Sequence, residues 1–125
     1  MNVQAGRRTI LVVEDNDDVR ALYSEALQGQ GYSVFEASNG SMGVAWLLSR
    51  DAVVDVILTD LRMPFMDGLE FAENLKADDR LSAIPIVLLS ATPMINSWYA
   101  RKHFAALLTK PCPLNLLLAT IDAVL

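Results

Sequence analysis

The segment 54–60 constrains the fold of this 125-residue chain more than any other stretch. Residues 54–58 are β-branched or apolar apart from one aspartate, which is typical of a strand buried on both faces of a sheet. Asp60 then falls at the carboxyl end of that strand, where open α/β sheets place their ligand sites. The loop 61–68 contains a proline and ends on an Asp-Gly pair, which favours a turn into a helix. The pattern predicts a carboxylate held at the end of a rigid central strand.

Similar apolar, β-rich runs recur along the chain and alternate with segments of helical periodicity. The expected strands are 9–13, 32–37, 54–58, 84–89 and 104–109. The expected helices are about 18–28, 41–49, 68–76, 94–103 and 114–125, of which the fourth is weakly periodic. Strands that alternate with helices form a parallel sheet with helices on both faces. The sequence therefore predicts a doubly wound α/β domain of five parallel strands and five helices.

The helical periodicity also predicts which side chains face the sheet. We expect Asp17 to be the N-cap of the first helix and Leu22 to lie on its buried stripe. The second helix is expected to turn Val44, Ala45 and Leu48 inward.

The last helix is more apolar than one buried stripe requires. Its expected inner face consists of Leu114, Leu117, Leu118, Ile121 and Leu125. Leu116 and Val124 lie outside that face, and such an excess indicates either a protein interface or contact with a segment outside these residues.

Composition limits the class of protein. A 53% hydrophobic fraction with 20% charged residues predicts one compact domain over residues 9–125, after a loose polar lead-in over residues 1–8. The net charge of −5 argues against nucleic acid or an anionic membrane as the main partner. A single cysteine excludes a disulfide framework, and no apolar run reaches the ~20 residues of a membrane span. A cytoplasmic domain is expected.

Polar side chains that could bind a ligand or take part in a reaction follow four of the predicted strands. Glu14 and Asp15 follow the first strand, Asp60 follows the third, Ser90 the fourth and Lys110 the fifth. Because the carboxyl ends of parallel strands share one edge, we expect these side chains to converge. Three carboxylates repel one another unless a cation joins them, and hard oxygen ligands with room for water favour Mg²⁺. With a lysine and a hydroxyl nearby, the site would suit a phosphoryl group, and the central aspartate would be the nucleophile.

Four short motifs surround these residues. They are Leu11-Val12-Val13-Glu14-Asp15-Asn16, Leu58-Thr59-Asp60-Leu61-Arg62-Met63-Pro64-Phe65-Met66-Asp67-Gly68, Leu88-Leu89-Ser90-Ala91 and Leu108-Thr109-Lys110-Pro111. In order and spacing they resemble the receiver domains of the two-component response-regulator family, and the resemblance covers Thr9 to Leu125. It implies a flavodoxin-like sheet with strand order 2-1-3-4-5.

The resemblance also implies a role for each site residue. Asp60 would accept a phosphoryl group from a sensor histidine kinase or a histidine phosphotransfer protein, with Ser90 and Lys110 contacting that group. Such a domain catalyses only its own phosphorylation and dephosphorylation, so it is not an enzyme acting on an external substrate. The implied ligands of Mg²⁺ are Glu14, Asp15, Asp60 and the backbone carbonyl of Arg62.

In this family phosphorylation switches the face formed by the last two helices and the fifth strand, so a homodimer or an output partner is implied there. The chain departs from the family in that Leu107 stands where an aromatic switch residue is usual. The segment between Ser90 and Lys110 is slightly short, which predicts a truncated fourth helix. The resemblance further implies a cis peptide before Pro111.

Two alternatives stay open. A haloacid-dehalogenase-like phosphatase also uses an aspartyl nucleophile with Mg²⁺, but it typically has a second aspartate where this chain has Arg62. A receiver-like interaction module that works without phosphorylation is the other alternative. The acid pair, Asp60, Ser90 and Lys110 argue against it, whereas Leu107 and Arg62 keep it open.

Overall fold

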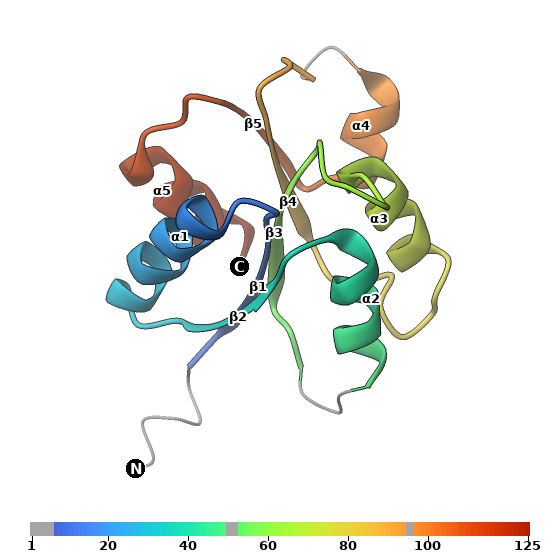
Figure 1. Cartoon of the computed structure of the whole chain (residues 1–125), viewed down its shortest axis with the longest axis horizontal. Helices are drawn as coiled ribbons and strands as arrows, with labels where there is room; N and C mark the ends of the chain where they lie inside the picture. The colour runs from blue at the N-terminus through green and yellow to red at the C-terminus, as the bar shows by residue number, and fades with distance from the viewer. Residues whose placement is uncertain (1–6, 50–52, 95–96) are drawn as a thin grey trace.

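The computed structural model describes residues 7–49, 53–94 and 97–125 and shows a central parallel sheet between two layers of helices (Figure 1). The strands are β1 (Thr9–Val13), β2 (Ser33–Ala37), β3 (Val56–Asp60), β4 (Ile86–Ser90) and β5 (Ala106–Thr109). The helices are α1 (Asp17–Gly29), α2 (Gly40–Leu48), α3 (Gly68–Lys76), α4 (Trp98–His103) and α5 (Leu114–Val124). The strand order is β2-β1-β3-β4-β5, so the predicted doubly wound, flavodoxin-like fold is confirmed. Residues 1–6 of the predicted lead-in lie outside the described residues.

The strands alternate their side chains between two hydrophobic cores, one on each face of the sheet. In β1, Leu11 and Val13 join the core that includes Phe71 of α3, whereas Ile10 and Val12 join the other core. Figure 1 shows α1 and α5 together on one face of the sheet and α2, α3 and α4 on the other. The continuous apolar runs of the sequence follow from this arrangement, because both faces of the inner strands are covered.

β3 and β4 form the rigid centre that carries the candidate site. All residues of both strands are buried, including the polar ends Asp60 and Ser90. Asp60 is paired with Leu89 in the register of the sheet, and Ser90 is paired with Thr109. The ends of three neighbouring strands therefore lie beside one another.

The N-cap of α1 differs from expectation. Asn16, rather than the expected Asp17, is the N-cap of α1, and its side chain accepts a hydrogen bond from the Val19 amide. Both residue types are good caps, so the backbone path out of β1 decides between them. Asn16 has the extended φ and ψ of −82° and 118° that an N-cap requires.

The inner face of α2 was predicted correctly for Val44, which packs against the core, and wrongly for the other two residues. Ala45 is exposed and Leu48 is 43% exposed, whereas Gly43 and Leu47 are buried. A Cβ atom at Gly43 would lie only 3.1 Å from the Phe71 ring. The absence of a side chain therefore lets the helix approach α3, which a pattern of large apolar residues does not reveal.

The amphipathic faces of α1 and α5 are narrower than predicted. Leu22 is 49% exposed and Leu114 is 36% exposed, whereas Leu27, Leu117 and Ile121 are fully buried. Only a narrow row of side chains on α1 and α5 packs into the core, so residues at the edges of the predicted apolar faces lie outside it.

α4 has only six residues, as the short segment before β5 predicted. It begins at Trp98, and residues 95–96 of the longer helix that was expected lie outside the described residues. None of the helices that the structure describes has the length and apolar character that a membrane span requires.

Candidate functional site

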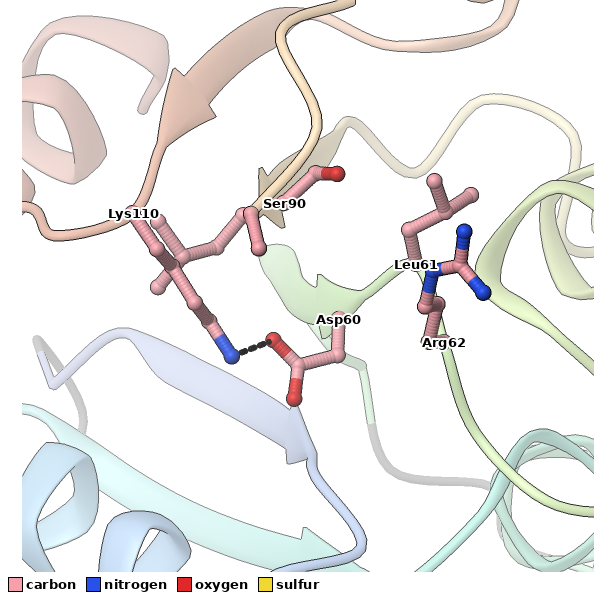
Figure 2. Close-up of a pocket in the computed structure, with 7 residues that line it drawn as sticks. Asp60, Leu61, Arg62, Ser90 and Lys110 are labelled. Atoms are coloured by element: carbon pink, nitrogen blue, oxygen red, sulfur yellow. Dashed lines mark ion pairs between the residues drawn. The ribbon is translucent and has the colours of Figure 1, made fainter.

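Asp60 lies at the carboxyl end of β3, and its side chain is 6% exposed. The ammonium of Lys110, which follows β5, lies 2.6 Å from Asp60 Oδ1, and Figure 2 shows the lysine side chain reaching down to that carboxylate. The peptide bond between Lys110 and Pro111 is cis, as the resemblance implied. The structure therefore brings together two of the predicted site residues from the ends of β3 and β5, the strands on either side of β4.

Glu14 and Asp15 join Asp60 in a cluster of three carboxylates. One oxygen from each of the three residues lies within 4.8 Å of the others. The Glu14 side chain is 3% exposed, and its Oε2 atom accepts a hydrogen bond from the Asn16 amide. Glu14 Oε1 has no hydrogen-bond partner among the described residues, although Lys110 Nζ lies 3.6 Å away.

The pKa values of Glu14 and Asp15 are raised, so the cluster disfavours the ionised form of both carboxyl groups. Burial raises the pKa of Glu14, and the neighbouring Asp60 raises it further. Burial and the neighbouring Glu14 likewise raise the pKa of Asp15. Burial opposes the charge of Lys110, but its hydrogen bond to Asp60 and the negative charges nearby outweigh burial and raise its pKa. The positive charge of the one ammonium group thus offsets only part of the negative charge of the three carboxylates.

These residues fit a divalent cation. Glu14 Oε1 is a buried oxygen without a hydrogen-bond donor, and it belongs to a cluster whose oxygens are already close together. Carboxylate oxygens are the hard ligands that Mg²⁺ prefers, and a bound cation would relieve the repulsion that raises the pKa of Glu14. Asp15 is exposed, so the cluster opens to solvent on that side.

A pocket of about 60 Å³ opens beside this cluster. It is lined by Asp60, Leu61, Arg62, Leu89, Ser90, Ala91 and Lys110. Ser90 is 3% exposed, and its Oγ atom accepts a hydrogen bond from the Thr92 amide at 3.0 Å. Figure 2 shows this hydroxyl turned away from the Asp60 carboxylate. The hydroxyl therefore lies at the pocket without contacting the aspartate.

Arg62, an implied metal ligand through its backbone carbonyl, and Leu107, which stands where an aromatic switch residue is usual, lie in different places. Arg62 lines the pocket and is exposed, and Figure 2 shows its side chain pointing away from the Asp60 carboxylate. Leu107 is partly buried and packs against the core shared with α3 and α4. Of the aromatic residues that follow Ser90, Tyr99 donates a hydrogen bond to Glu73 of α3 and Phe104 is buried, and neither lines the pocket.

Arg20 supports the site, and the sequence reasoning missed it. Its guanidinium donates to the backbone oxygen of Glu14 at 2.8 Å and forms ion pairs with Asp17 and Glu36. The loop that carries Glu14 is thereby joined to both α1 and β2. The spacing of Asp17 and Arg20 at i and i+3 was a signal for one of these contacts, but the contact with the Glu14 backbone had no signature in the sequence.

Gly68 holds the loop after Asp60 against the end of β3. Its amide donates to the Leu61 oxygen at 2.7 Å, and an added Cβ would lie 2.2 Å from the Asp60 backbone oxygen. Asp67 caps α3 by accepting from the Glu70 amide at 2.8 Å. This glycine is therefore required by close approach of two backbones at the site.

The fold and the site together define a class of protein. A doubly wound parallel sheet that carries an acidic cluster and a lysine at its carboxyl edge is the architecture of a receiver domain in two-component signalling. Residues 10–122 match the response regulator receiver domain family, and the chain belongs to that family. Receiver domains are generally signalling modules rather than enzymes.

Individual relatives agree with this assignment. The chain is 35% identical over 118 residues to Protein PilH of Pseudomonas aeruginosa, a match that covers 93% of this chain and 96% of PilH. The solved structure of the chemotaxis response regulator CheY4 of Vibrio cholerae superposes with a TM-score of 0.86 at 30% identity, over 95% of this chain and 99% of CheY4. The response regulator TrrA of Thermotoga maritima, solved with Mg²⁺ and BeF, gives a TM-score of 0.83 at 27% identity over 94% and 99% of the two chains. This chain spans only between 10% and 48% of the length of several longer curated relatives.

Proposed function

We propose that this domain is a phosphorylation-controlled switch in which Asp60 accepts a phosphoryl group. The observation that carries the proposal is the buried Asp60 carboxylate, 2.6 Å from the Lys110 ammonium and clustered with Glu14 and Asp15 beside a small open pocket. The donor would be a phosphohistidine of a sensor histidine kinase or of a histidine phosphotransfer protein. The solved complex of TrrA with Mg²⁺ and BeF supports the proposal that a domain of this fold holds a metal together with a phosphoryl-like group.

The step is an exchange of one bond for another. An oxygen of Asp60 attacks phosphorus, the bond from phosphorus to the histidine nitrogen breaks, and that nitrogen keeps the bonding electron pair. The product is an acyl phosphate on Asp60. The domain catalyses only this transfer and the later hydrolysis of its own acyl phosphate, so we do not assign it an external substrate.

The residues around Asp60 supply charge and positioning. Glu14, Asp15, Asp60 and the backbone carbonyl of Arg62 would hold Mg²⁺, which when bound would offset negative charge on the phosphoryl oxygens. Lys110 keeps its proton because the carboxylates raise its pKa, and it would donate to a phosphoryl oxygen after transfer.

Ser90 would couple the phosphoryl group to the rest of the fold. Its hydroxyl points away from Asp60 before phosphorylation, and we infer that it turns inward to donate to a phosphoryl oxygen. The Thr92 amide then loses its acceptor, and the loop before α4 rearranges. The face of α4, β5 and α5 would change its affinity for an output partner or a second copy of the chain, because the phosphoryl group contacts the two states differently. The exposed Trp98 and Leu116 of α4 and α5 suit an interface in the cytoplasm.

The coupling can be tested with a phosphoryl analogue. Beryllofluoride with Mg²⁺ should shift the backbone amide resonances of residues 90–93 and of β5 in wild type. Asp60→Asn should abolish these shifts, because the analogue requires the carboxylate. Shifts confined to residues 14–15 in wild type would indicate metal binding without a switch, and they would contradict the proposed coupling.

A further inference from the structure

Phe65 is the most unusual exposed residue of the described chain. Its side chain is 88% exposed, the largest exposed fraction among the large hydrophobic residues that the structure describes. Its φ of 70° is the one positive value among the described non-glycine residues. Bulky side chains rarely adopt this left-handed region, because it crowds Cβ against the backbone.

The loop holds Phe65 in this conformation from both sides. The Met66 amide donates to the Pro64 oxygen at 2.8 Å, so Phe65 is the central residue of a three-residue turn. The Met66 side chain accepts from Asn74 of α3 and lies close enough to α2 that a Cβ at Gly40 would stand 3.0 Å from its sulfur. Met66 is therefore packed against two helices, whereas the side chain of Phe65 stays in solvent.

In the free domain this arrangement has a cost without a visible gain. A left-handed non-glycine residue is strained, and an exposed ring packs against nothing that would compensate. Such strain persists where the surrounding structure imposes it, and it is concentrated at functional sites. A glycine or an asparagine would fit the same turn with less strain.

The position of the loop indicates which partner the ring serves. Leu61 and Arg62, which begin this loop, line the pocket beside Asp60. A phosphoryl group that reaches Asp60 through this pocket passes Leu61 and Arg62, and its donor comes with it. A protein donor is large enough to cover this loop, whereas a small phosphodonor such as acetyl phosphate occupies the pocket alone.

We propose that Phe65 is the anchor on which the phosphohistidine-bearing donor protein docks, with the ring seated in an apolar recess of that donor. This inference rests on the proposed role of Asp60 as phosphoacceptor. A single aromatic side chain buries enough apolar surface to dominate a small interface, and aromatic residues are enriched among the residues that carry binding energy. The donor, rather than the output partner, is assigned because it is the partner that must come close to Asp60, beside which this loop begins, for transfer to occur.

The test compares protein and small-molecule donors on the full chain. Purified sensor kinases and histidine phosphotransfer proteins are phosphorylated, and the one that labels wild type fastest serves as the probe. Transfer rates are measured over a range of receiver concentrations for Phe65→Asn and Phe65→Leu. Val53→Asn is the matched control, because Val53 is also highly exposed, at 76%, but precedes β3 and so lies at the opposite end of that strand from Asp60. Every variant is also labelled with acetyl phosphate and Mg²⁺.

The expected pattern is specific to the donor. Phe65→Asn should lower the second-order rate of transfer from the protein donor at least about tenfold, mainly by raising the half-saturating concentration, with a smaller loss for Phe65→Leu. Labelling by acetyl phosphate and the melting temperature should not fall in either variant, and Val53→Asn should behave as wild type throughout. Equal transfer rates for Phe65→Asn and wild type would overturn the docking role while leaving Asp60 as the acceptor.

The remaining outcomes are also decisive. If acetyl phosphate does not label Asp60 in wild type, the proposed function itself fails. If acetyl phosphate labels wild type but no protein donor does, Phe65 has no donor to dock and the inference is overturned. Slower labelling of Phe65→Asn by acetyl phosphate as well would mean that the ring acts on the pocket, which also contradicts docking.

Discussion

Replacing Gly68 by alanine tests whether close backbone approach positions the site. Gly68 begins α3, and it is buried against the chain that leaves β3. A Cβ atom there would lie 2.2 Å from the Asp60 backbone oxygen and 3.0 Å from the Leu61 Cα atom. Neither neighbour can rotate away, because both atoms belong to the backbone.

The size of the effect follows from these contacts. The distance to the Asp60 oxygen must lengthen by about 0.8 Å to reach 3.0 Å, below which real Cβ contacts essentially do not occur. Forcing extra volume into a packed region costs roughly 1–3 kcal/mol. The hydrogen bond from the Gly68 amide to the Leu61 oxygen would be stretched or lost, at about 1 kcal/mol. Alanine recovers up to about 1 kcal/mol of helix propensity, so we expect a net loss of about 1–3 kcal/mol.

Urea denaturation measures this loss. With a slope of about 1–3 kcal/mol per molar urea for a small domain, the midpoint should fall by roughly 1 M in Gly68→Ala. Gly29→Ala is the matched control, because Gly29 is the last residue of α1 and a Cβ there meets no atom within 4 Å. That variant should be as stable as wild type or slightly more stable.

An unchanged midpoint for Gly68→Ala would refute the reasoning about backbone approach. A loss of equal size in Gly29→Ala would refute it as well, since the effect would then come from glycine replacement in general. A large loss in Gly68→Ala alone would show that the loop after β3 cannot move without destabilising the fold.

Three further predictions concern the acidic edge. The pKa of Glu14 is raised in the folded state, so its ionisation opposes folding as the pH rises from about 4.5 through its folded pKa. Glu14→Gln should therefore stabilise the metal-free domain at pH 7, and this gain should vanish below pH ~4.5. Equal urea midpoints for the variant and wild type at pH 7 would contradict the raised pKa. Asp67→Ala removes the side-chain cap of α3 and should cost about 1 kcal/mol, whereas Asp67→Ser should retain most of the stability; equal losses for the two would exclude a capping role. Mg²⁺ at ten times its dissociation constant should stabilise wild type by about 1.4 kcal/mol and raise its melting temperature by a few degrees. The shift in melting temperature should be clearly smaller for Asp15→Asn, and identical shifts would argue against the acidic cluster as the metal site.

The architecture was predictable from the sequence because apolar strand-like runs alternate with helical segments, and four of these runs are followed by a polar site residue. The runs before Glu14, Asp60, Ser90 and Lys110 placed these side chains at one edge once the parallel sheet was inferred. The short α4 was also predictable, since too few residues separate β4 from β5. These features depend on periodicity and chain length, which a single sequence contains.

Other features depend on which atoms meet, and these were missed or misassigned. Asn16 and Asp17 are both good N-caps, and only the backbone path selects Asn16. Gly43 faces inward because it makes room for Phe71, and a helical wheel places larger residues there. The strained, exposed Phe65 had been read as an ordinary part of a motif. In each case the deciding contact joins segments that the sequence pattern describes separately.

The most direct measurement for the central claim is the intact mass of the chain after treatment with acetyl phosphate and Mg²⁺. Wild type should gain about 80 Da, the mass of one phosphoryl group, because Asp60 forms an acyl phosphate. Asp60→Asn, in which only the carboxylate is replaced, should gain nothing under the same conditions. A gain of that mass in the variant, or in neither protein, would contradict the assignment of Asp60 as the phosphoacceptor.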